Sequence, residues 1–217
     1  VGAGPAQEDE TTGGASQVLG LSMLELPEGH PLRKTWVKTL ELSGSDTEVT
    51  AAKDTMLLVL EIPSESLDTT LQVLAERVRE PGRGLEGIDE IKARLLRSHT
   101  DRAATPLAHG KLGEHFESLA YGRHPYSRTR DGTPDAVRGL NRERLAEFQK
   151  KWWAPNNLVL TLTGDVDPDK ALARVQELFG AMPAAPMVRA APPEVPLPDA
   201  PRKEILSLPV ESSAMQV

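Results

Sequence analysis

The stretch that decides the expected fold is YGRHPYSRTRDGTPDAVRGLNRERLAEFQKKWWAPNNLVLTLTGDVDPDKALARVQELFGAMP, residues 121–183. Its pattern predicts a helix that Asn141 caps, then a Pro-Asn turn and an apolar strand over residues 157–163. A Gly-Asp turn follows, with a second helix that has Pro168 as its first residue. The stretch therefore predicts a strand connected to helices on both sides.

The segments before this stretch extend the same architecture. Residues 47–52 and 55–62 alternate like two strands joined in a hairpin, and apolar residues at helical spacing follow over residues 67–78. Residues 85–120 are largely helical in pattern. Together these segments predict an α+β fold, in which a mainly antiparallel β-sheet is covered on one face by helices.

Composition excludes several kinds of protein. The 217 residues include 39% hydrophobic and 26% charged residues and no cysteine, and the net charge is −7. A nucleic-acid partner is not expected, because phosphate binding requires a surplus of Lys and Arg. The apolar runs are too short for a membrane span. Disulfides and thiolate metal sites are excluded, but the lack of cysteine does not distinguish the bacterial cytoplasm from the periplasm.

Domain boundaries are predicted near the C-terminal end. Residues 1–183 read as one α+β module, and the proline-rich residues 184–203 are typical of an extended linker. Residues 204–217 are expected to begin another strand, which has little to pair with in the remaining chain. No internal repeat is evident.

Four strings in a fixed order carry a resemblance to a known family. They are GPAQEDETTGGAS (4–16), LELSGSDTEVTAAKDTMLLVLEIPSESLDTTLQVLAERV (40–78), HPYSRTRDG (124–132) and PNNLVLTLTGDVD (155–167). Over about residues 1–183 the chain resembles the insulinase/pitrilysin peptidases, a zinc protease family that includes mitochondrial processing peptidase. The resemblance implies a half-molecule of two modules joined by a linker, with Val1 inside the first strand of the first module and residues 204–217 in the second module. The chain is then expected to be a piece of a longer polypeptide.

The family's zinc motif is expected to be degenerate here. In the family, H-x-x-E-H on a helix supplies two histidine ligands and the glutamate that polarises the attacking water, and a later helix supplies a third ligand. The matching positions in this chain are Ser16 and Gly20 for the histidines and Leu19 for the glutamate, and the third ligand falls at Arg97 or Ser98. None of these side chains can replace its counterpart, so no catalytic residue, metal ligand or cofactor is expected in this chain.

The resemblance implies a function shared with a partner. The first hypothesis is a non-catalytic subunit that pairs with a homologous zinc-bearing subunit, as a hetero- or homodimer, around an unfolded peptide or protein substrate. The chain would then belong to a metallopeptidase family without being active itself. One alternative is an active zinc metallopeptidase with ligands outside these residues. Another is a structural or assembly subunit without a protease partner, like the core subunits of the respiratory bc1 complex.

Overall fold

A computed structural model describes residues 1–43, 47–104, 108–187, 194–195 and 203–205. The predicted linker over residues 184–203 lies only partly within these ranges. The strand predicted at 204–217 lies almost wholly outside the described residues.

Within the described ranges the chain forms eight α-helices and one hairpin. The elements, in chain order, are α1 (Ala15–Ser22), α2 (Arg33–Ser43), β1 (Glu48–Ala51), β2 (Met56–Val59), α3 (Leu67–Arg79), α4 (Ile88–Ala104), α5 (Ala108–Tyr121), α6 (Pro134–Gly139), α7 (Arg142–Trp152) and α8 (Pro168–Phe179). None of these helices is long and apolar enough to cross a membrane.

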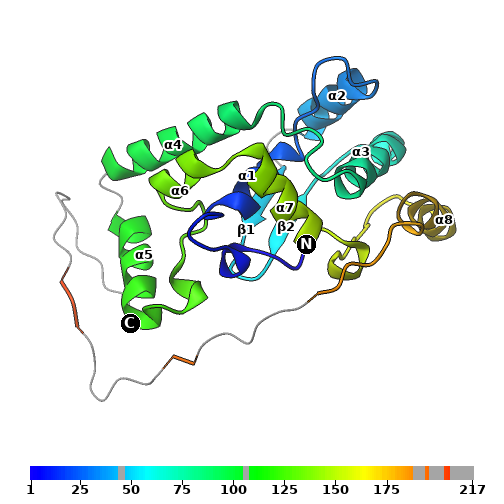
Figure 1. The fold of residues 1–217 in the computed structure, drawn as a ribbon. Coiled ribbons are helices and arrows are strands. Elements are labelled where there is room, and N and C mark those ends of the chain that lie inside the picture. Colours follow the sequence, from blue (N-terminus) through cyan, green and yellow to red (C-terminus); the bar gives the residue numbers. More distant parts are fainter. Residues whose placement is uncertain (44–46, 105–107, 188–193, 196–202, 206–217) are drawn as a thin grey trace.

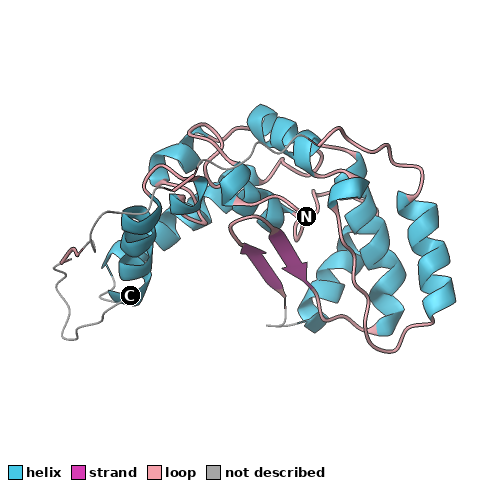
Figure 2. Ribbon diagram, turned by 90° about the horizontal axis from the view of Figure 1, so that it is seen from below, coloured by secondary structure: helices cyan, strands magenta, loops and turns pink. Residues whose placement is uncertain are grey.

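The hairpin lies near the middle of the molecule. β1 and β2 are antiparallel, with Glu48 opposite Val59 and Ala51 opposite Met56. Helix α1 packs against both strands. Figures 1 and 2 show the helices gathered around this hairpin, with α3 and α8 on one side and α5 on the other. Helix α1 covers one face of the hairpin, and Leu57 and Val59 are exposed on the other face.

The main hydrophobic core is built around α1. Ala15, Val18 and Leu19 are fully buried, and they belong to one cluster with apolar residues of α4, α6 and α7. Those helices contribute Ile91, Leu95, Val137, Leu145, Phe148 and Trp152. Every residue of α1 except Leu21 is buried, as expected of a helix at the centre of the core.

The prediction of a mainly antiparallel sheet covered by helices is wrong. Among the described residues helices predominate, and β1 and β2 form the only sheet. The predicted strand at 157–163 is not formed, although Leu158 is extended, with φ −112° and ψ 141°. A strand pattern favours an extended backbone, whereas a sheet also requires a neighbouring strand with which to exchange hydrogen bonds. Residues 159–163 make no such backbone bonds within the described part of the chain.

The predicted helix starts in the deciding stretch are confirmed. The Asn141 side chain accepts a hydrogen bond from the backbone N–H of Arg144 at 2.9 Å and caps α7. Pro168 is the first residue of α8, and the Asp167 side chain accepts from the N–H groups of Asp169 and Lys170. These caps depend on neighbouring residues alone, which is why the sequence predicts them well.

Candidate functional site

Helix α1 carries three of the positions matched to the zinc motif. A buried carboxylate holds the start of this helix. Glu8, only 3% exposed, accepts hydrogen bonds from the N–H groups of Gly14 and Ser16, both at 2.8 Å. These donors lie at the start of α1, where N–H groups lack helical partners. Burial raises the pKa of the Glu8 carboxyl, and the bonds from Ser16 and Gly14 oppose this shift. The sequence analysis missed this residue, whose signal is an acidic side chain just before a Gly-rich helix start.

The structure places Ser16, Leu19 and Gly20 on α1, all buried. Gly20 faces the hairpin so closely that a Cβ atom there would lie 2.6 Å from Val49 Cγ1 and 3.2 Å from Met56 Sδ. Such distances leave no room even for a methyl group without movement of the strand side chains. An imidazole cannot replace Gly20 in this packing.

The fourth position lies on another helix. Arg97 is exposed on α4, which packs against α1 through other residues. In the described part of the chain, no three His, Cys, Asp or Glu residues come together as a metal site would require. The residues present at the four positions therefore do not fit zinc. Their correspondence to the family's ligands remains a prediction from the resemblance.

The hairpin face turned away from α1 is open and carries exposed apolar side chains of β2. Met56 points toward α1 and is buried, whereas its neighbour Leu57 is 51% exposed and Val59 is 37% exposed. Successive side chains of a strand alternate between the two faces, so Leu57 and Val59 share the uncovered face. Val159 is 88% exposed, in the extended segment beyond α7. Exposed apolar residues in such a grouping are typical of a surface that contacts another chain.

A polar network holds the tip of the hairpin. The hydroxyl group of Tyr126 donates to Asp54, and Lys53 Nζ bonds Glu117 at 2.6 Å and the backbone oxygen of Arg128 at 2.9 Å. The bond to Asp54 raises the pKa of Tyr126. The His124 ring accepts from the N–H of Tyr126, which shapes the His-Pro-Tyr turn. Each of these groups already has a structural partner, so the turn positions the hairpin rather than presenting reactive groups.

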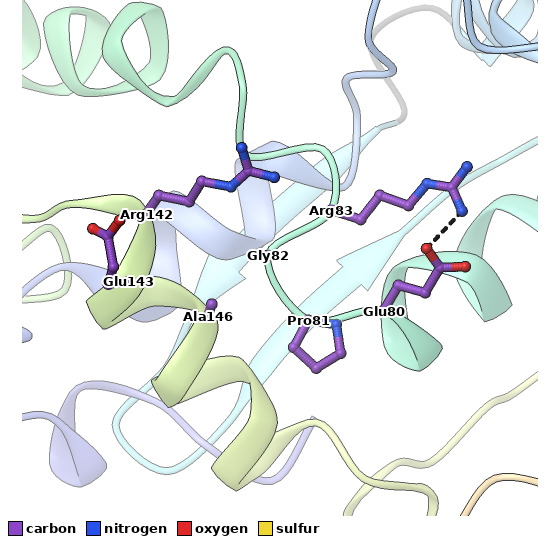
Figure 3. Close-up of a pocket in the computed structure, with 7 residues that line it drawn as sticks. All are labelled: Glu80, Pro81, Gly82, Arg83, Arg142, Glu143 and Ala146. Atoms are coloured by element: carbon purple, nitrogen blue, oxygen red, sulfur yellow. Dashed lines mark hydrogen bonds and ion pairs between the residues drawn. The ribbon is translucent and has the colours of Figure 1, made fainter.

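A surface hollow lies between α7 and the segment that follows α3. Its lining of Glu80, Pro81, Gly82, Arg83, Arg142, Glu143 and Ala146 is shown in Figure 3. Glu80 and Arg83 pair at 2.7 Å, and both are substantially exposed. An exposed ion pair of this kind is weak and screened by solvent. The hollow contains no cluster of groups suited to catalysis.

Comparison with known proteins shows which families and structures this chain is similar to. The family model described as "Peptidase M16 inactive domain" matches residues 139–216. An uncharacterized zinc protease of Mycobacterium leprae is 23% identical over 181 residues, which cover 83% of this chain and 40% of that protein. The chain thus spans less than half the length of this curated relative.

Two solved structures share the fold. The peptidase M16 inactive domain from Pseudomonas fluorescens matches with a TM-score of 0.70 and 24% identity, over 87% of this chain and 45% of that one. The first half of the periplasmic protease PqqL from Escherichia coli matches with a TM-score of 0.71 and 18% identity, over 88% and 42%. The family match, the zinc protease relatives and these structural neighbours agree with the resemblance seen in the sequence. The chain is similar to proteins of the insulinase-like (M16) peptidase family.

Proposed function

We propose that this non-catalytic insulinase-like module forms one wall of a peptide-binding chamber, together with a homologous subunit or module that carries zinc. The observation on which the proposal rests is the packing at Gly20. There, apolar side chains of the hairpin fill the space that a histidine ligand would need. A module of this kind can contribute surface and shape, while hydrolysis depends on a metal held elsewhere.

The uncovered hairpin face supports a role in peptide contact. Leu57 and Val59 stand exposed side by side along the strand direction, and Thr50 lies opposite Leu57 on the same face. An unfolded peptide exposes apolar side chains that gain free energy when such a surface removes them from water. The contact requires no particular peptide sequence, which suits a chamber that accepts unfolded chains.

The similar proteins are longer than this chain. The chain covers 40% of the mycobacterial relative and 42% of the half-protease structure, so each of them is long enough to hold a second segment of this size. A wall formed by one module encloses a chamber only when a second module faces it. We therefore expect the partner to be another insulinase-like module with an intact H-x-x-E-H helix.

The test combines metal analysis with peptide cleavage. The protein is purified alone, and the homologue with the intact motif is purified separately. Zinc content is measured for each, and cleavage of an internally quenched unfolded peptide is followed for each protein and for their mixture. We expect no bound zinc and no cleavage for this protein alone, and faster cleavage by the mixture than by the homologue alone. Stoichiometric zinc with cleavage by this protein alone would refute the proposal.

A matched pair of variants tests the proposed surface. Leu57→Gln removes an apolar side chain from the uncovered hairpin face, whereas Leu172→Gln removes an equally exposed one from α8, far along the chain. We expect only Leu57→Gln to raise the KM of the mixture for the peptide, with unchanged circular dichroism in both variants. Equal changes of KM in the two variants would show that the hairpin face does not contact the peptide. A stable complex without any gain in cleavage would instead favour a structural subunit.

A further inference from the structure

After α8 the chain turns back toward the middle of the molecule (Figure 1). Residues 181–187, named here the return segment, belong to neither a helix nor a strand. Met182 and Met187 lie near its two ends, and both pack against the main hydrophobic core although each is only partly buried. Apolar contacts of two methionines therefore attach the return segment to the rest of the molecule at both ends.

One side chain holds the middle of the return segment. Asn156 lies in the short turn after α7, and its Nδ2 donates to the carbonyl of Ala185 at 3.0 Å. Its Oδ1 accepts from the N–H of the same residue at 3.1 Å. Both bonds are exposed, so water competes for the same groups and each bond stabilises the segment only modestly. The return segment therefore depends on the methionine contacts on either side of this pair of bonds.

A methionine side chain changes from apolar to polar in a single oxidation step. Hydrogen peroxide transfers one oxygen atom to the thioether sulfur, so that the O–O bond breaks, an S–O bond forms and water is released. The sulfur is oxidised by two electrons, and methionine sulfoxide reductases reverse the change. The sulfoxide oxygen is a polar group whose burial without a hydrogen-bond partner costs free energy. Oxidation therefore weakens the contact of a methionine with an apolar core.

Exposure divides the described methionines into two pairs. Met23 is 5% exposed and Met56 is 4% exposed, and both lie inside the main core. Met182 and Met187 pack against the same core but remain partly exposed, so an oxidant dissolved in water reaches them without opening of the fold. We propose that Met182 and Met187 are sites of reversible oxidation by peroxides, and that their oxidation detaches the return segment from the core. This inference is independent of the proposed peptide-binding function.

The first experiment measures which methionines react. The folded protein is treated with hydrogen peroxide, and the gain of one oxygen atom at each methionine is followed by mass spectrometry of proteolytic peptides. We expect Met182 and Met187 to react about tenfold faster or more than Met23 and Met56, because the buried pair reacts only through local opening. In urea the four rates should become similar. Equal rates in the folded protein, or slow reaction at Met182 and Met187, would overturn the proposal.

The second experiment measures detachment of the return segment. Amide hydrogen exchange at Ala185 reports it, because this N–H is bonded to Asn156. We expect oxidation to speed this exchange by about fivefold or more, and treatment with methionine sulfoxide reductases to restore the initial rate. Gly82 is the control, since its N–H makes a buried bond to Gln149 away from the return segment. Equal acceleration at Gly82 would show general unfolding and overturn the proposal, as would an unchanged rate at Ala185.

Substitutions at the same positions separate the chemistry from the packing. Leucine keeps the volume and apolar character of methionine but offers no sulfur to oxidise. We expect the double variant Met182→Leu/Met187→Leu to retain slow exchange at Ala185 when peroxide is added. Met187→Gln places a polar group at the contact and should speed the exchange at Ala185 without any oxidant. A response to peroxide that persists in the double variant, or unchanged exchange in Met187→Gln, would contradict the assignment.

Discussion

Gly20 stands where the family resemblance places a zinc-binding histidine, and its surroundings leave no space for such a side chain. The helix α1 lies so close to the hairpin at this point that Val49 and Met56 occupy the direction in which a Cβ atom would project. Glycine at this position permits the close approach that forms the core. Close packing at this position excludes a ligand side chain.

A substitution at Gly20 tests this packing. Gly20→Ala is expected to lower the free energy of unfolding by about 1–3 kcal/mol, because the added methyl group overlaps side chains of β1 and β2. Gly139→Ala is the control, since a Cβ there meets only the tip of the Arg144 side chain, 3.5 Å away. We expect the control to be neutral or slightly stabilising, as alanine is the better helix former. Urea denaturation measures both values, and equal losses would contradict the packing argument.

Glu8 allows a second test at the same scale. In Glu8→Ala the N–H groups of Gly14 and Ser16 lose their acceptor, and we expect a loss of about 1–3 kcal/mol, reduced in part by relief of the buried charge. The exposed Glu10, two residues away, supplies the control variant Glu10→Ala, with an expected change near zero. Thermal denaturation of the two variants at neutral pH makes the comparison. Similar melting temperatures would show that Glu8 does not hold the start of α1.

At the scale of elements, one side chain of α7 connects this helix to the last turn of α3 and to the segment that follows α3. Gln149 of α7 is buried; its Oε1 accepts from the N–H of Gly82 at 3.0 Å, and its Nε2 donates to the carbonyl of Arg77 at 2.6 Å. Arg77 lies in the last turn of α3, and Gly82 lies in the connection to α4. The sequence pattern marked residue 149 only as part of a helix. Its role follows from the tertiary approach of α7 to that connection.

Replacing Gln149 by Met keeps most of the side-chain volume and removes both bonds. Two buried backbone groups then lack partners, and we expect Gln149→Met to cost about 2–4 kcal/mol. Lys150→Met, at the exposed neighbouring position, is the control and is expected to change stability little. Hydrogen exchange at Gly82 provides the local readout, and it should accelerate only in the Gln149 variant. Unchanged hydrogen exchange at Gly82 would contradict the role assigned to the Gln149 side chain.

For the whole molecule, the placement of Val1 beside Met56 makes the stability of a protein produced to begin at Val1 depend on pH. Burial lowers the pKa of the Val1 ammonium from its ordinary value of 8.0, so the unfolded chain binds a proton more readily than the folded one. Stability from this group is therefore present above pH 8 and is lost as the pH falls through the lowered value. The same contact ties the start of the chain to β2, 55 residues away in sequence.

Acetylation of Val1 isolates this effect. The acetylated nitrogen still donates one hydrogen bond to Met56 but carries no titratable charge, so the stability attributed to this group no longer falls below pH 8. We expect the acetylated protein to be more stable than the free form at pH 6.5, and the difference to shrink toward pH 9. Urea denaturation at a series of pH values measures the difference. A difference that is constant with pH would contradict burial of the ammonium group.

The sequence by itself determined the local features. The cap at Asn141, the helix start at Pro168 and the hairpin turn depend on residues within a few positions of one another, and the structure confirms them. Tertiary structure alone decided the extent of the sheet, because residues 159–163 have a strand pattern but no described strand beside them. It also decided the roles of Glu8, Gln149 and the Gly20 contact. Buried hydrogen bonds and close packing join residues that are far apart in the chain, and their geometry exists only once the helices have come together.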